Sequence, residues 1–180
     1  MTMFVAGGAA MFDHFHGPVP PMFRMDEEAW ERHANPWSVW TRIATWPALA
    51  LALWSFHWFG GWSLLPMFVI IGWLMLNPLA FPPPASTKSW ASRTVLGERV
   101  YFRREFHPIP VEHANAATLL SIGSGVGLLL LIAGLLTREP AAFLTGGAVL
   151  LLCKLWFADR MVWLFDDMKE RVPEYRAWLR

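Results

Sequence analysis

Four stretches of almost entirely apolar residues constrain the fold of this chain more than any other feature. They extend over approximately residues 43–59, 62–80, 116–136 and 141–158. A hydrocarbon core of ~30 Å is crossed by ~20 helical residues, and a helix satisfies its own backbone hydrogen bonds inside lipid. We therefore predict an all-α integral membrane protein with four transmembrane helices. The short turns at Gly60-Gly61 and Thr137–Pro140 would join these helices into two hairpins.

The composition agrees with a membrane location. Hydrophobic residues make up 55% of the 180 residues and charged residues only 16%, against ~25% charged residues in soluble domains. The 12 Trp residues suit the bilayer interfaces, where the ring is half in lipid and its N–H stays hydrated. The net charge of +1 provides no bulk field for a nucleic acid. The single cysteine, Cys153, excludes an intramolecular disulfide.

The segments outside the four stretches divide the chain further. Residues 1–25 form an apolar tail rich in Met, Phe, Gly and Pro, a candidate partner-binding arm, and residues 26–180 form the membrane domain. We predict a short amphipathic helix over Asp26–His33 and an amphipathic or irregular cytoplasmic segment over Ala85–Asn115. The last helix should continue beyond the membrane as an amphipathic extension that Pro173 interrupts. Its apolar face would consist of Met161, Leu164, Met168, Val172, Tyr175 and Leu179.

The positive charges predict the orientation in the membrane. Of the 15 Lys and Arg residues, all but Arg138 belong to the N-terminal, middle and C-terminal regions. Four spans place these three regions on one side, and positive residues stay in the cytoplasm. We expect a multi-pass protein of the bacterial cytoplasmic (inner) membrane with both termini in the cytoplasm. The alternative is that one apolar stretch is re-entrant or lies along the interface.

Small residues in the third and fourth apolar stretches indicate close helix packing. Gly123 and Gly127 are spaced four residues apart, which places them on one helix face, and Gly146-Gly147 offers a counterpart. Small residues allow membrane helices to approach each other closely. The pattern indicates packing within the chain, with oligomerisation through the same face as the alternative.

Polar residues at the cytoplasmic ends of the helices are the candidate site. We predict ion pairs among Glu98, Arg99, Asp159 and Arg160, because charges at the membrane boundary are costly unless they are paired or reach water. These four residues, together with His33, are the catalytic candidates if the protein is an enzyme. The simpler interpretation is that they tie the middle segment to the helix ends.

The six histidines do not predict a metal site, because neither a Cys pair nor two His at helical ligand spacing is present. His57 lies in an apolar stretch, where a histidine is a candidate functional residue. Its surroundings resemble the pigment-binding helices of light-harvesting polypeptides, which implies a bacteriochlorophyll or haem ligand. The alternative is an interfacial histidine that reaches water or a headgroup, and no other cofactor is expected.

Several short motifs resemble an uncharacterised family of small membrane proteins, known only as a domain of unknown function. The resemblance extends over roughly Asp26 to Trp178 and implies a polytopic membrane protein without supplying an activity. The motifs are His33-Ala-Asn-Pro-Trp-Ser-Val-Trp-Thr-Arg42, Asn77-Pro-Leu-Ala-Phe81, Val95-Leu-Gly-Glu-Arg-Val100 and Trp156-Phe-Ala-Asp-Arg-Met-Val-Trp163.

Two functions compete. The first is a non-catalytic accessory or assembly subunit of a larger membrane protein complex, energy-transducing or photosynthetic, because aromatic and Met-rich tails suit protein contacts. Its partners would be the lipid bilayer and other membrane proteins, with no nucleic acid. The alternative is a small membrane enzyme or binding protein that acts on a lipid or amphiphile at the cytoplasmic face. We favour the subunit and therefore expect no catalysis.

Overall fold

The computed structural model describes residues 26–180, and within this range it contains helices and no strand. The predicted tail, residues 1–25, lies outside the described residues. The helices are α2 (Glu27–His33), α3 (Pro36–Trp54), α4 (Phe56–Phe59), the 3-10 turn η2 (Gly60–Ser63), α5 (Leu64–Ala80), α6 (Trp90–Phe102), α7 (Val111–Thr137), α8 (Pro140–Arg171) and α9 (Pro173–Arg176).

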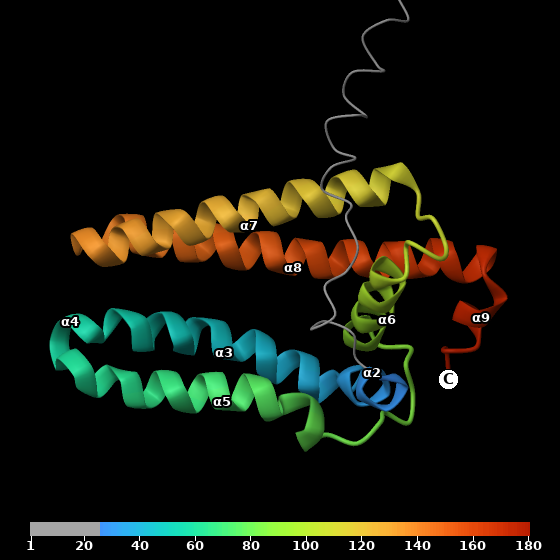
Figure 1. Cartoon of the computed structure of the whole chain (residues 1–180), viewed down its shortest axis with the longest axis horizontal. Helices are drawn as coiled ribbons and strands as arrows, with labels where there is room; N and C mark the ends of the chain where they lie inside the picture. Colours follow the sequence, from blue (N-terminus) through green and yellow to red (C-terminus); the bar gives the residue numbers. More distant parts are fainter. Residues whose placement is uncertain (1–25) are drawn as a thin grey trace, which may run out of the picture.

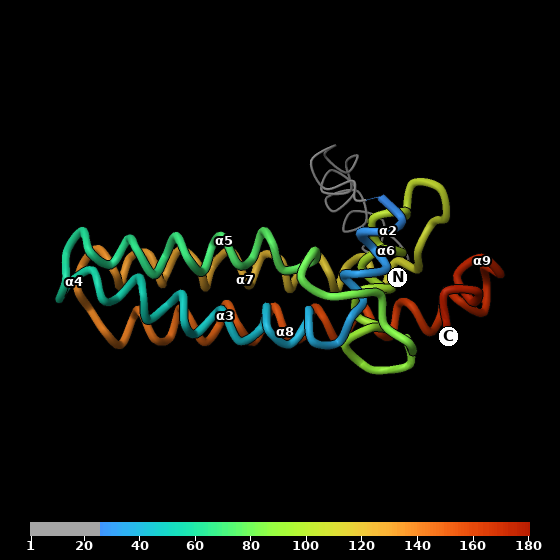
Figure 2. Tube along the Cα trace, turned by 90° about the horizontal axis from the view of Figure 1, so that it is seen from below, coloured from blue at the N-terminus to red at the C-terminus, as the bar shows by residue number. Residues whose placement is uncertain are grey.

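The long helices form two hairpins, α3 with α5 and α7 with α8, that lie alongside each other (Figures 1 and 2). The short helices α2, α6 and α9 gather at one end of the hairpins, which we call the polar end. The connections α4–η2 and Arg138–Glu139 lie at the opposite end, the turn end. The predicted arrangement of two hairpins with a segment between them is therefore present.

Three regions are long and apolar enough to cross a membrane, which makes this a multi-pass membrane protein by helix composition. They are Pro36–Ala80, Val111–Thr137 and Pro140–Arg171. The first region has 45 residues and folds back on itself as the α3–α5 hairpin, in which α3 has 19 residues and α5 has 17. Most of the large apolar side chains of α5 face outward, as expected for a surface in contact with lipid.

The helix boundaries differ from the predicted ones because capping and turn residues determine them. Helix α3 begins at Pro36 and not near residue 43, because the Asn35 side chain accepts a hydrogen bond from the Trp37 N–H at 2.9 Å and proline suits a first helical position. Helix α5 begins at Leu64 because the 3-10 turn Gly60–Ser63 precedes it. Helix α7 begins at Val111, five residues before the predicted start at residue 116.

The C-terminal extension is confirmed. Helix α8 continues without a break to Arg171, and its apolar face packs into the core with Met161, Leu164 and Met168 fully or almost fully buried. Val172 is extended, and Pro173 begins the separate helix α9, whose Tyr175 joins the same core. Helix α2, capped by the Asp26 carboxylate at 2.7 Å from the Ala29 nitrogen, also confirms the prediction for that segment.

Helix α6 was predicted only as part of an amphipathic or irregular segment, but it is a regular helix with most of its residues buried. Gly97 makes this position possible, because a Cβ there would lie 1.9 Å from the Met161 carbonyl oxygen of α8. The contact between α6 and α8 thus depends on a glycine backbone that can approach another backbone directly.

The small residues of α7 and α8 pack against each other within the chain. A Cβ on Gly127 would lie 2.6 Å from the Leu150 nitrogen, and a Cβ on Gly146 would lie 2.3 Å from the Leu131 nitrogen. These distances are shorter than a carbon atom allows, so the two helices are in contact through their backbones. Intrachain packing accounts for the glycine pattern in the described structure.

Candidate functional site

Asn77 connects the two helices of the first hairpin at the polar end. Its side chain is fully buried; it accepts a hydrogen bond from the Ser38 hydroxyl at 2.6 Å and donates one to the Thr41 hydroxyl at 2.8 Å. The motif Asn77-Pro78 therefore holds the end of α5 against the start of α3. Asn35 makes a similar connection, since its amide donates to the Pro82 carbonyl at 2.8 Å.

Helix α6 joins the two hairpins at the polar end. The Trp90 ring stacks on Trp40 of α3 with centroids 5.4 Å apart, and its N–H donates to the Asp159 carboxylate of α8 at 2.9 Å. The Thr94 hydroxyl donates to the Ala158 carbonyl of α8 at 3.2 Å. The carboxylate of Asp159, a predicted site residue, is thus hydrogen-bonded to the indole of Trp90.

The predicted ion pairs among Glu98, Arg99, Asp159 and Arg160 are wrong, because none of these four residues pairs with another in the described structure. Arg99 instead pairs with Glu27 of α2, which also accepts from Arg103 at 2.6 Å. The Arg99 guanidinium lies 3.9 Å from the centre of the Trp178 ring. Burial, and then the positive charge of Arg103, lower the pKa of Arg99 to about 10.

Arg160 does not take part in the contacts of Arg99. Its guanidinium lies 4.7 Å from the centre of the Trp163 ring on the same helix. A Trp three residues further along a helix is a neighbour on the same face, and a cation over an indole ring is stabilised by the ring quadrupole. Arg160 and Arg99 therefore pack on different tryptophans and do not form one site.

Glu98 faces two cations that come from different helices. Burial raises the pKa of the Glu98 carboxyl, and the positive charges of Arg42 on α3 and Lys154 on α8 lower it in part. Within the described residues, Glu98 forms no hydrogen bond and no ion pair with either of them or with any other group. The side chains of α3, α6 and α8 thus bring one carboxyl and two cations to one place without direct contact.

His33, the remaining candidate, is buried beside Arg42. Its Nε2 atom is in close contact with the Arg42 Nη1 atom, and because a guanidinium can only donate, this imidazole nitrogen must accept. Burial, and then the Arg42 charge, lower the pKa of His33 to about 3. His33 is therefore neutral at physiological pH. We call the three charged residues Arg42, Glu98 and Lys154 the charged cluster. His33 lies next to this cluster through its contact with Arg42.

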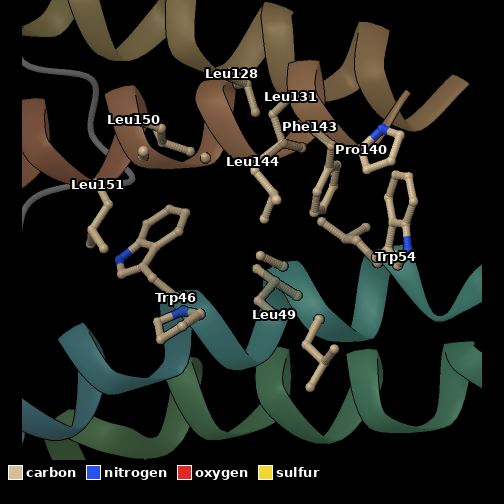
Figure 3. A pocket seen from close by; sticks show the side chains of 16 residues that line it. Trp46, Leu49, Trp54, Leu128, Leu131, Pro140, Phe143, Leu144, Leu150 and Leu151 are labelled. Carbon is tan, nitrogen blue, oxygen red and sulfur yellow. The ribbon is translucent and has the colours of Figure 1, made fainter. Parts of the chain in front are cut away.

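An apolar cavity of about 440 Å³ lies between the two hairpins. Figure 3 shows Trp46, Leu49 and Trp54 of α3 on one side and Leu144, Leu150 and Leu151 of α8 on the other, with open space between them. Cavities of ~300–1,000 Å³ hold small-molecule ligands. Its lining also includes the exposed residues Leu144 and Ala148, so the cavity opens to the outer surface of the helices.

The cavity is closed toward the turn end by aromatic rings. Trp54 and Phe143 contact each other with centroids 4.9 Å apart, and they join the two hairpins there. His57 packs edge-on against Trp54, also with centroids 4.9 Å apart, and is not among the lining residues. His57, the predicted pigment or haem ligand, therefore contacts a residue of the cavity wall without lining the cavity, and its ligand role stays a prediction.

Two of the three residues of the charged cluster were absent from the predicted site. Arg42 and Lys154 lie in or beside the apolar stretches and were not among the candidate residues. The signal that identifies them is their spacing, since Arg42 precedes the lining residue Trp46 by one helical turn and Lys154 follows Leu151 by three residues. Within residues 26–180, no group of His, Cys, Asp and Glu side chains could hold a metal ion.

The comparisons with known proteins identify a family and no activity. The family of unknown function DUF6653 matches residues 19–177, so the chain belongs to this family. The match begins seven residues earlier than the resemblance predicted, and so includes part of the predicted tail. No curated protein and no solved structure matches the chain.

Proposed function

We propose that this member of the DUF6653 family binds a lipid-like amphiphile between its two hairpins, at the cytoplasmic side of the membrane. The observation that supports it is the apolar cavity of about 440 Å³, whose walls on α3 and α8 lead directly to the charged cluster. A chain-like apolar group would occupy the cavity, and a polar group would lie at the cluster. This is the alternative that the sequence left open, and the geometry favours it.

A cavity of this size is unusual inside a packed protein. Protein interiors reach the packing density of organic crystals and contain few voids larger than a water molecule. The cavity is lined by apolar side chains, and an apolar cavity does not hold water well. Because it opens to the surface that lipid would cover, an apolar chain from the bilayer can enter it sideways.

The site requires a topology in which the polar end faces the cytoplasm. We infer four spans, α3, α5, α7 and α8, with both termini on the cytoplasmic side. Every Lys and Arg of the described residues except Arg138 lies in the polar end or within two turns of it, and such residues stay cytoplasmic. The exposed Trp58 and Trp62 at the turn end would lie at the opposite interface.

Cysteine labelling tests this topology, because Cys153 can be replaced by serine to give a background without thiols. We expect Gly61→Cys and Arg138→Cys to react with an impermeant reagent from outside the cell. We expect Ser86→Cys to react only after permeabilisation. Labelling of Gly61→Cys and Ser86→Cys from the same side would contradict a crossing by α5.

Ligand binding can be tested by filling the cavity. Ala148 lines the cavity and Ala48 of α3 does not, while both are exposed in the described structure. We expect the wild-type protein, extracted in mild detergent, to carry an amphiphile that native mass spectrometry detects. Ala148→Trp should lose it and the matched control Ala48→Trp should keep it. Equal amounts of bound amphiphile in the two variants would argue against a ligand in the cavity.

The accessory-subunit hypothesis depends mainly on the tail of residues 1–25, which lies outside the described residues, and so it stays a prediction. Deleting these residues should release the protein from any complex during mild-detergent fractionation. Unchanged co-migration would count against a tethering role for the tail.

A further inference from the structure

The charged cluster lies where the headgroup of a ligand in the cavity would be. On α3, the lining residues Trp46, Leu49 and Leu53 follow the spacing of one helix face, and Arg42 continues that face by one turn. Four residues of helix advance by about 6 Å. Arg42 is therefore the next side chain beyond the cavity toward the polar end.

Helix α8 repeats this arrangement from the opposite wall. Its lining residues Gly147 and Leu151 lie on one helix face, and Lys154 and Ala158 continue that face. Ala158 receives the Thr94 hydrogen bond from α6, and Glu98 lies one turn after Thr94. The apolar faces of two helices thus end in one cation each, and α6 adds a carboxyl between them.

The three charged groups attract one another but do not meet. Glu98 is influenced by both cations, yet within residues 26–180 neither Glu98 nor Lys154 has a hydrogen bond or an ion pair. Charges at a membrane boundary are normally paired, because an unpaired charge is costly there. Arg42 contacts His33 and the Ser38 carbonyl but no carboxylate, and Lys154 is exposed. The end of the cavity therefore leaves space for an anionic partner that binds between the two cations.

We propose that the ligand is a single-chain amphiphile that ends in a phosphate group, with its chain in the cavity and its phosphate between Arg42 and Lys154. The proposal rests on the proposed function and specifies the ligand of the same site. A phosphate has enough oxygens to accept from both cations at once. Arg42 keeps its Nη2 group for this role, because its Nε donates to the Ser38 carbonyl at 3.2 Å and its Nη1 contacts His33. The rings of Trp54 and Phe143 close the far end of the cavity, and its volume suits one chain.

Charge distinguishes a phosphate from other headgroups. The two cations exceed the single carboxyl, so a cationic headgroup would be repelled. Burial raises the pKa of the Glu98 carboxyl, and a carboxyl that takes up a proton can donate a hydrogen bond to a phosphate oxygen. A carboxylate headgroup has two oxygens and one charge, whereas a phosphate monoester has three terminal oxygens and up to two charges and can therefore contact both cations at once. His33 does not alter this balance, because it is neutral and accepts from Arg42.

Binding of defined probes by the full chain in phosphatidylcholine nanodiscs tests the proposal. Trp46 and Trp54 line the cavity, so their fluorescence can report binding. We expect dodecyl phosphate to bind at least roughly 10-fold more tightly than dodecanol, the range that one charge-assisted hydrogen bond provides. We expect inorganic phosphate alone to compete only weakly.

Variants separate the headgroup from the chain. Lys154→Gln should weaken dodecyl phosphate binding by roughly 10-fold and leave dodecanol binding unchanged. Arg138→Gln, which removes a cation at the turn end, is the matched control and should change neither. Lys154 has no hydrogen bond in the described structure, so its replacement should not unfold the protein. Arg42→Gln should act in the same direction, provided that its circular dichroism stays that of the wild type.

The outcomes distinguish the two proposals. Equal binding of dodecyl phosphate and dodecanol, with both lost in Ala148→Trp, would overturn the phosphate headgroup and keep the amphiphile site. Binding of neither probe would overturn both. Competition by inorganic phosphate at the concentration of the alkyl phosphate would show an anion site without a role for the chain, and would also overturn the proposal.

Discussion

Gly127 offers the sharpest test of the contact between α7 and α8, because a matched glycine lies two residues away. A Cβ on Gly127 would lie 2.6 Å from the Leu150 nitrogen and 2.9 Å from the Gly146 oxygen, whereas a Cβ on Gly125 would meet nothing within 4 Å. Both residues belong to α7. The two Gly→Ala variants therefore share the same change in helix propensity and differ only in what the new methyl group touches.

The expected magnitudes follow from two opposing effects. Replacing glycine with alanine inside a helix stabilises it by up to ~1 kcal/mol, which is the whole effect expected for Gly125→Ala. At Gly127 the methyl group meets backbone atoms, which cannot rotate away, so α7 and α8 must separate. Overpacking of this kind costs about 1–3 kcal/mol. We expect Gly127→Ala to be less stable than Gly125→Ala by about 1–3 kcal/mol.

Reversible unfolding in mixed micelles, with increasing sodium dodecyl sulfate and circular dichroism as the readout, measures this difference. Both variants should retain the helix content of the wild type before the transition. If Gly127→Ala unfolds at the same detergent fraction as Gly125→Ala, the helices do not touch through Gly127 and the reasoning is refuted.

Three further predictions concern the polar end. Asn77→Leu should lower the free energy of unfolding by ~0.6–2 kcal/mol, the range for hydrogen bonds between membrane helices; an unchanged unfolding midpoint would mean that the Asn77 bonds to Ser38 and Thr41 add nothing. The pKa of His33 is lowered from 6.5 to about 3, so only the unfolded state binds a proton between these values, and stability should fall as pH drops below 6.5, by up to ~1.4 kcal/mol per pH unit. His33→Gln should remove this component of the pH dependence. Unfolding curves of both proteins at pH 7 and pH 5 measure it, and an equal loss of stability in the variant and the wild type would contradict the role of His33. Trp178→Leu should cost ~0.5–2 kcal/mol, because it removes the ring under the Arg99 guanidinium; thermal unfolding in detergent measures the loss, and no shift would leave this contact without a stabilising role.

The sequence predicted the elements whose pattern is local. The C-terminal extension has an apolar face at helical spacing, and Met161, Leu164 and Met168 bury that face as expected. Asp26 is a good N-cap residue, and α2 follows it. Helix ends were less accurate, because the apolar stretch predicted a start near residue 43, whereas Asn35 caps a helix that begins at Pro36. The same residue types end one helix and start the next, and only the fold decides between the two roles.

The partners of charged residues could not be predicted, because they depend on how the helices are rotated against each other. Arg99 was expected to pair with residues of α8, but it lies on a face of α6 that meets Glu27 of α2 and Trp178. Glu98, its neighbour, points toward α3 and α8. Adjacent residues of a helix differ in direction by about 100°, so a small error in the rotation of α6 exchanges the two sets of partners.

The cavity itself follows from how the two hairpins are held apart. At the polar end, α6 lies between them: Gly97 lets α6 contact the α8 backbone, while Trp90 stacks on Trp40 of α3. At the turn end, the rings of Trp54 and Phe143 set the separation. Between these two points Gly146 of α8 packs against the α7 backbone, while Gly147 and Ala148 line the cavity. A space bounded by large side chains at both ends cannot close without losing one of these contacts, so the contacts at the two ends hold the cavity between the hairpins open.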